Sequence, residues 1–155
     1  FIYGEEKMSK IIAKKIVSER LNKKIKTTKE LVKIIESAVG AKYFNKNHPE
    51  RQIFQAIRIE VNDELNVLQK ALDDAIDLLN VGGRLCVITF HSLEDRIVKN
   101  FFRSGNLEGK IDKDFYGNIL TPFKVLEKGL TASQEEVNRN PRARSAKLRI
   151  AEKLA

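Results

Sequence analysis

A histidine and a serine stand where an apolar run gives way to a helical pattern, in the segment FHSLEDRIVKNFF. His91 and Ser92 directly follow the apolar run RLCVITF. Sheets of the α/β class bind ligands at the carboxyl ends of their strands, so His91 could hydrogen-bond a base or a phosphate there. A structural hydrogen bond that holds this corner of the chain is the alternative for His91. Ser92 could contact the same ligand, or it could simply cap a helix that starts at Leu93.

A second group of polar side chains lies in the segment HPERQIFQAIRIEVNDEL. Steps of four, three and four residues place them on one side of a predicted helix, beside its apolar face. The members of this polar column are Arg51, Gln55, Arg58 and Asn62. Two guanidiniums and two amides can hold phosphates and the edges of a base. A solvated helix flank is the alternative, since polar columns beside apolar stripes are common.

A third group is the pair of arginines in NPRARSAKLR. Arg142 and Arg144 stand on a loop immediately before the last predicted strand, where they could bind a nucleic-acid backbone. Ion pairing with Glu135 or Glu136 is the alternative. The chain has only two histidines and one cysteine, without metal-ligand spacing, so we expect no metal site.

Composition favours a polyanion as the partner. The 155 residues carry a formal net charge of +8, from 29 basic and 21 acidic side chains, and each phosphate that a protein neutralises releases counterions. A single cysteine fits a reducing compartment. No apolar run approaches the roughly 20 residues that span a bilayer. We therefore expect a cytoplasmic protein without a membrane segment. The start, FIYGEEKM, lacks an initiator Met, so we expect the interior of a longer protein.

The periodicity of apolar residues predicts the elements that hold these groups in place. Helices are expected over residues 5–21, 27–40, 50–79 and 93–102, with a short helical turn at 135–136. A capping box joins Thr27 and Glu30. The helix over 50–79 should break within 71–74, and residues 42–47 should form a loop. Strands are expected over 84–90, 123–127 and 145–152. The apolar run at 84–90 predicts an interior strand, covered on both faces in the full sheet.

Three long segments of this chain resemble the RsmH (MraW) family of bacterial 16S rRNA (cytosine-N4)-methyltransferases. They are HPERQIFQAIRIEVNDEL, GGRLCVITFHSLEDRIVKNFFR and NPRARSAKLRIAEK, and their order and spacing also match. YGEEKMSKIIAKKIV and TTKELVKII are similar to the helical insertion of that family. Glu50 stands where the family more often has alanine. The order of elements after residue 70 is also similar to the closing half of a Rossmann-like methyltransferase sheet.

The resemblance implies an α/β enzyme that uses S-adenosylmethionine to methylate a decoding-centre cytosine of the small ribosomal subunit. Residues 1–70 would be a helical insertion domain. Residues 71–155 would be the C-terminal half of a Rossmann-like methyltransferase sheet. The family's cofactor motifs lie upstream, so we expect no cofactor-binding residue here and no activity from this chain alone. In that setting His91 would help position the base, and the polar column would line the cleft. A noncatalytic rRNA-binding module and a helical protein-interaction adaptor remain alternatives, and the sequence permits a homodimer.

Overall fold

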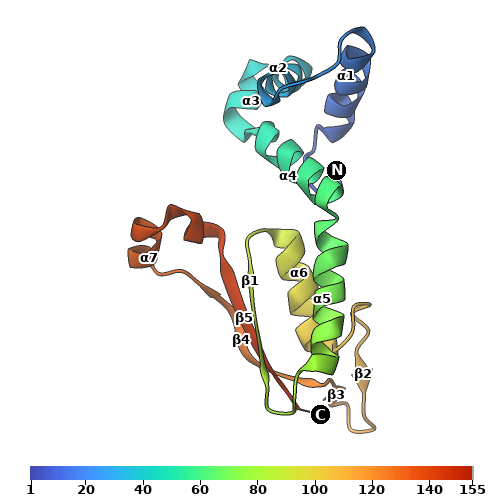
Figure 1. The fold of residues 1–155 in the computed structure, drawn as a ribbon, viewed down its shortest axis with the longest axis vertical. Coiled ribbons are helices and arrows are strands. Elements are labelled where there is room, and N and C mark those ends of the chain that lie inside the picture. Colours follow the sequence, from blue (N-terminus) through green and yellow to red (C-terminus); the bar gives the residue numbers. More distant parts are fainter. Residues whose placement is uncertain (155) are drawn as a thin grey trace. The chain divides into compact units, whose positions relative to one another are not determined.

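Helices form the first part of the chain, and a small sheet with helices forms the second part (Figure 1). This computed structural model describes residues 1–154. The chain divides into two compact units, Phe1–Glu64 and Leu65–Ala155. The mixed α/β class expected from the sequence is therefore confirmed.

The first unit is built from four helices around a small apolar centre. These are α1 (Ser9–Asn22), α2 (Thr28–Val39), α3 (Ala41–Asn47) and α4 (Pro49–Asn62). Ile12, Ile35 and Ile59, one each from α1, α2 and α4, are at most 1% exposed. Full burial of such a side chain is worth roughly 1.5–3 kcal/mol. This shared centre fixes the three longer helices against one another.

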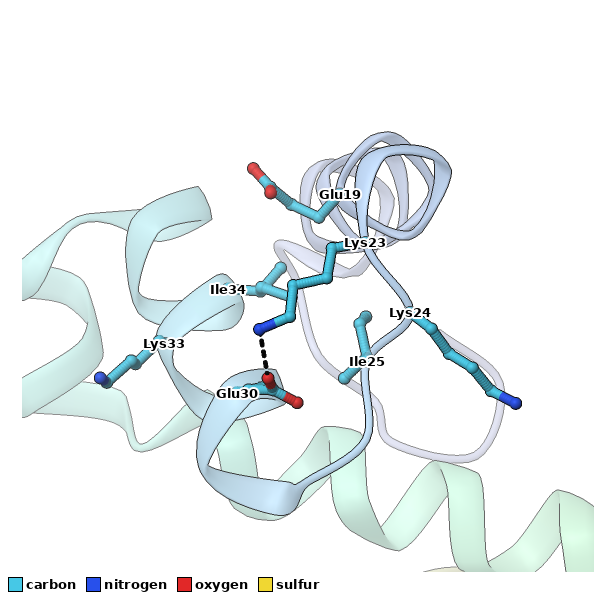
Figure 2. A pocket seen from close by; sticks show the side chains of 7 residues that line it. All are labelled: Glu19, Lys23, Lys24, Ile25, Glu30, Lys33 and Ile34. Carbon is cyan, nitrogen blue, oxygen red and sulfur yellow. Dashed lines mark hydrogen bonds and ion pairs between the residues drawn. The ribbon is translucent and has the colours of Figure 1, made fainter.

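The turn between α1 and α2 is closed by the predicted capping box, which is confirmed. The Thr27 hydroxyl accepts a hydrogen bond from the Glu30 amide at 3.2 Å, and the Glu30 carboxylate accepts one from the Thr27 amide at 3.1 Å. Lys23 donates to the same carboxylate at 2.9 Å (Figure 2). These bonds satisfy amides that the first turn of a helix leaves without partners.

The prediction of a loop over residues 42–47 is wrong, because this stretch is α3. Gly40, at φ 79°, ends α2 and directly precedes α3, and its carbonyl accepts a hydrogen bond from the Phe44 amide at 3.0 Å. The Tyr43 hydroxyl donates to Glu6, ahead of α1, at 2.7 Å. A tertiary contact thus stabilises a short helix whose Lys- and Asn-rich composition favours a loop.

The break predicted within residues 71–74 is also wrong, because the helical chain is interrupted at Asp63 instead. Asp63 has a φ of 52° and ends α4, with its amide donating to the Ile59 carbonyl. The next helix, α5 (Glu64–Leu78), continues through Asp73 and Asp74, which are exposed and start no new helix. Aspartate is one of the few non-glycine residues that enters the left-handed region readily.

The second unit contains a three-stranded sheet with α5 and α6 on one face (Figure 1). The elements after α5 are β1 (Arg84–Thr89), α6 (Ser92–Ser104), β2 (Asp112–Lys113), β3 (Ile119–Leu120), β4 (Phe123–Thr131), α7 (Gln134–Arg139), the 3-10 helix η1 (Pro141–Ser145) and β5 (Lys147–Lys153). The strand order is β1-β5-β4, and both neighbouring pairs are antiparallel. β1 and β4 therefore run in the same direction, with β5 reversed between them.

Phenylalanines dominate the core on the helix-covered face of this sheet. The core consists of Leu72, Val98, Phe101, Phe102, Phe123 and Ala151, all at most 2% exposed. The three rings lie with centroids 5.6–6.4 Å apart, within the usual range for paired aromatic side chains. The Lys153 ammonium donates to the Ile76 and Leu79 carbonyls at 2.7 and 3.0 Å, which ties the end of α5 to β5.

The predicted strand at residues 84–90 is confirmed as β1, which alternates between a covered and an open face. Leu85 and Val87 pack against the core, whereas Cys86 and Ile88 are exposed, Ile88 by 58%. Among the described strands β1 lies at a sheet edge. The coverage of both its faces in a fuller sheet stays a prediction.

Candidate nucleic-acid interface

One end of the sheet in the second unit brings together two of the groups predicted from the sequence. Thr89, at the end of β1, pairs with Lys147 at the start of β5. Thr131, at the end of β4, pairs with the same Lys147. α6 starts just after β1, and α7 with η1 joins β4 to β5. We call this region the strand-end surface and define it by His91, Ser92, Arg142 and Arg144.

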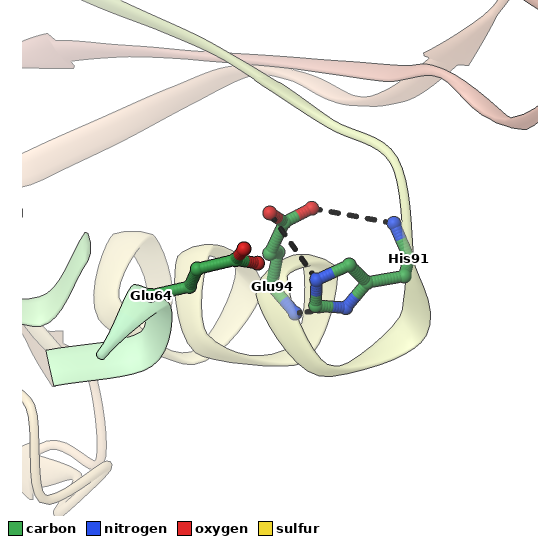
Figure 3. Close-up of side chains that lie close together, drawn as sticks. All are labelled: Glu64, His91 and Glu94. Atoms are coloured by element: carbon green, nitrogen blue, oxygen red, sulfur yellow. Dashed lines mark hydrogen bonds and ion pairs between the residues drawn. The ribbon is translucent and has the colours of Figure 1, made fainter. Parts of the chain in front are cut away.

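His91 caps α6 through a complete capping box (Figure 3). Its Nδ1 accepts a hydrogen bond from the Glu94 amide at 3.4 Å. The Glu94 carboxylate accepts from the amides of His91 and Phe90 at 3.3 and 2.8 Å. Since Nδ1 is an acceptor, the neutral ring carries its proton on Nε2. The structural alternative for His91 is thus observed, and a ligand role is compatible with it only through Nε2.

The Nε2 atom of His91 has no hydrogen bond among residues 1–154. It lies 3.3 Å from Glu94 Oε1, yet the orientation does not meet hydrogen-bond geometry, and the side chain is 9% exposed. Buried polar atoms in folded proteins usually have a partner. On the strand-end surface, Nε2 is therefore a buried polar atom that lacks a hydrogen bond among the described residues.

The prediction that Ser92 is the N-cap of this helix is wrong. The cap position requires extended backbone, and His91 adopts it with φ −138° and ψ 164°. Ser92 is already the first residue of α6 and is exposed.

A buried ion pair fixes the start of α6 to the sheet. Arg149 of β5 is 8% exposed. Its guanidinium donates to Asp95 Oδ1 at 2.7 Å and to Oδ2 at 3.1 Å, and it also donates to the Lys128 carbonyl in a β4 bulge. The hydrogen bond from Arg149 holds the pKa of Asp95 below its usual value. Because Asp95 lies in the first turn of α6, this pair also sets the position of His91.

The Asp95–Arg149 pair was not predicted from the sequence. The alternation in β5 favours Leu148 and Ile150 as its core face, yet Arg149 shares the other face with Ala151, which is fully buried. An arginine at an inward position needs a carboxylate partner. Lys147 adds a weaker contact, with Nζ 3.4 Å from Asp95 Oδ2.

Arg142 and Arg144 both lie on η1 and are exposed, on either side of Ala143, which is 6% exposed. Within residues 1–154 no carboxylate lies within 4.0 Å of either guanidinium. Ion pairing with Glu135 or Glu136 is therefore absent. The Asn140 side chain accepts from the Arg142 amide at 3.2 Å and orders the start of η1. Two unpaired guanidiniums on an ordered turn are suited to phosphate oxygens.

The polar column lies in the first unit, on α4, and its members differ in what they contact. Arg58 binds the Glu64 carboxylate in bidentate fashion at 2.8 and 3.1 Å, and Asn62 donates to the same group at 3.2 Å. Gln55 donates to the Tyr3 carbonyl at 3.2 Å. Arg51 has 73% of its side chain exposed, with Nε 3.9 Å from the Glu50 carboxylate. Arg51 is therefore the column residue least engaged within the protein.

The chain is a mixed α/β protein whose two units both expose arginines suited to phosphate. Residues 1–154 match the MraW methylase family model. The chain belongs to the MraW methylase family. None of the described helices is both long and apolar enough to cross a membrane.

Three curated relatives carry the name ribosomal RNA small subunit methyltransferase H. The one from Parabacteroides distasonis is 48% identical over 155 residues, and the one from Azobacteroides pseudotrichonymphae is 51% identical over 154. The one from Flavobacterium johnsoniae is 47% identical over 154 residues. Each match covers 99% of this chain and 50% of the relative. The chain thus spans about half the length of the curated relatives it matches.

Proposed function

We propose that the whole protein transfers a methyl group from S-adenosylmethionine to N4 of a decoding-centre cytosine in 16S rRNA, in the cytoplasm. The observation that carries this proposal is the family match over residues 1–154. Relatives named ribosomal RNA small subunit methyltransferase H, at 47–51% identity, support it. The basic net charge of +8 suits an RNA substrate.

Within that enzyme we assign residues 1–70 to a helical insertion domain and residues 71–155 to the second half of a Rossmann-like methyltransferase domain. The direction of the strands supports the assignment. β1 leads through α6 to β4, which runs parallel to it, with β5 reversed between the two. A strand, a helix and a second parallel strand form the basic crossover of α/β sheets.

The strand-end surface would meet the substrate base and its flanking phosphates. The Nε2–H of His91 would donate to the base and orient it, while Ser92 would contact the same nucleotide. Arg142 and Arg144 would hold phosphates, as would Arg51 and Arg58 of the polar column, with Gln55 and Asn62 beside them. In the reaction the cytosine amino nitrogen would form a bond to the methyl carbon as the bond from that carbon to the sulfur of the methyl donor breaks, and the nitrogen would then lose a proton to water. Positioning of the amino group is the contribution we assign to this chain.

We assign no cofactor-binding residue to this chain. The carboxylates in the first turn of α6 are already occupied, Glu94 by backbone amides and Asp95 by Arg149. A ribose would require a free acceptor of this kind. When the whole protein binds S-adenosylmethionine, that cofactor supplies the electrophilic methyl group.

The test is methyl transfer by the full-length protein to isolated ribosomal subunits. With methyl-labelled S-adenosylmethionine, label should enter the RNA of small subunits and not that of large subunits. Binding to small-subunit RNA without transfer would support the noncatalytic rRNA-binding module instead. A protein that neither binds RNA nor transfers label would support the protein-interaction adaptor.

A further inference from the structure

We propose that the turn between α1 and α2 is an additional contact for the RNA backbone, separate from the polar column and the strand-end surface. We call it the lysine turn; its members are Lys23, Lys24, Lys26, Lys29 and Lys33. The proposal rests on the proposed function, because it names a further surface for the same class of substrate. Its partner is the sugar–phosphate backbone, contacted without regard to base.

The lysine turn has a defined shape, because one carboxylate organises it. Glu30 Oε2 accepts hydrogen bonds from the amides of Lys26 and Thr27 at 2.8 and 3.1 Å, and Oε1 accepts from the Lys23 ammonium at 2.9 Å. These bonds, led by that from the Lys26 amide, lower the pKa of Glu30 to about 2. Glu30 is therefore ionised near neutral pH, and both of its carboxylate oxygens are occupied by hydrogen bonds within the turn.

The use of Glu30 leaves the remaining lysines without a counter-charge. In the described part of the chain, Lys24, Lys26, Lys29 and Lys33 have no carboxylate within 4.0 Å of their ammonium groups. All four are exposed. Unpaired like charges close together raise the local positive potential and attract polyanions. The two carboxylates that line the hollow, Glu19 and Glu30, are paired with Lys15 and Lys23, so they do not neutralise these four lysines.

The form of the surface suits phosphates rather than bases. Lys24 and Lys33 point to opposite sides of a shallow hollow floored by Ile25 and Ile34 (Figure 2). Ammonium groups act as point charges on flexible stems and bind phosphate oxygens without reading base edges. The residues lining this hollow include no aromatic ring on which an unpaired base could stack.

The test compares two triple variants of the full-length protein with equal loss of charge. K24Q/K26Q/K29Q removes lysines of the turn without touching Lys23 or Glu30. K70Q/K99Q/K124Q is the control, because these three lysines are exposed in the second unit and have no ion pair among residues 1–154. Circular dichroism of both variants should match that of the wild type.

The measured quantity is the dependence of binding on salt. Affinity for a decoding-region RNA is determined by fluorescence anisotropy over a series of KCl concentrations. The slope of log K against log salt is negative, and each lost phosphate contact reduces its magnitude by about 0.7–0.9. We expect the turn variant to lose roughly 2 units of slope if three contacts are partly or fully removed. The control variant should keep the wild-type slope.

Equal slopes in all three proteins would overturn the proposal, as would the same reduction in both variants, which would indicate a general effect of charge. A turn variant that keeps the RNA slope but loses binding to polyglutamate would identify an acidic-protein surface and would also overturn it. Methyl transfer is measured on the same preparations. If the wild type transfers the methyl group but the turn variant and the control variant have equal salt slopes, only this inference is wrong. If the slopes differ but no methyl group is transferred, only the proposed function is wrong.

Discussion

His91 serves as a helix cap in the structure, and its proposed second role depends on a different atom of the same ring. Nδ1 accepts the Glu94 amide, whereas Nε2 has no hydrogen bond among the described residues. Asparagine can replace a capping acceptor but places no donor where Nε2 lies. The two roles can therefore be separated by substitution.

We predict that His91→Asn in the full-length enzyme keeps stability within about 0.5 kcal/mol of the wild type. Its turnover should fall at least about tenfold with little change in RNA affinity, because the base loses its positioning donor. His91→Ala should lose the same turnover and, in addition, about 1 kcal/mol of stability. Single-turnover kinetics and urea denaturation measure the two effects. Normal turnover in His91→Asn would show that His91 caps α6 but does not position the base.

Arg149 and Asp95 should matter more for stability than any exposed pair on the same sheet. Arg149→Ala leaves the Lys128 carbonyl without this donor and the Asp95 carboxylate with only its weaker contact from Lys147. Removal of one partner of a buried pair costs about 3 kcal/mol. Arg84→Ala is the control, since Arg84 binds Glu152 at 3.2 Å with 65% of its side chain exposed, and its loss should cost less than about 1 kcal/mol. Similar unfolding free energies for both variants would contradict the assignment.

The same pair predicts how stability changes in acid. The bond from Arg149 lowers the pKa of Asp95 from its ordinary 3.8 in the folded protein. The stabilisation is therefore fully present above the unfolded value and is lost as the pH falls through the lower, folded value. Wild-type unfolding free energy should decline below pH 3.8, and Asp95→Asn should lack that part of the decline. Parallel curves for the two proteins would show that Asp95 does not contribute.

Local patterns were sufficient for some elements and not for others. The Thr27–Glu30 capping box was predicted because both members lie within one turn of α2. α3 was missed because its stability depends on a bond between Tyr43 and distant Glu6. In β5 the apolar residues Leu148 and Ile150 suggested a core face, yet Arg149 and Ala151 face the helices. No local rule reveals that Asp95, far away in sequence, will neutralise a buried arginine.

The break between α4 and α5 offers a test at the scale of helices. Asp63 holds a φ of 52°, which a β-carbon disfavours and glycine does not. We predict that Asp63→Val costs about 1–2 kcal/mol more in the free energy of unfolding than Asp63→Gly, because glycine adopts this φ without strain. Asp73→Val, in the continuous part of α5, should cost less than about 1 kcal/mol. If Asp73→Val lowers the free energy of unfolding more than Asp63→Val does, the helix break would lie within residues 71–74, as the sequence predicted.

At the scale of the whole molecule, each unit has its own apolar core, and the chain spans about half the length of its relatives. We predict that residues 1–155 alone do not bind S-adenosylmethionine, because the chain covers about half of each relative and we assign no cofactor-binding residue to it. Isothermal titration calorimetry of this chain should show no heat of binding, whereas the full-length protein should bind. Micromolar affinity of the chain alone would place cofactor contacts on residues to which we assign none.

The central claim is methylation of a single cytosine amino group in 16S rRNA by the full-length protein. The most direct measurement is mass spectrometry of nucleosides and fragments of small-subunit RNA after incubation with the protein and S-adenosylmethionine. The account predicts one added methyl group, recovered as N4-methylcytidine within a decoding-centre fragment. Methyl transfer to a ring carbon, to a sugar hydroxyl or to another part of the RNA would contradict it, as would no transfer by a protein that binds both ligands.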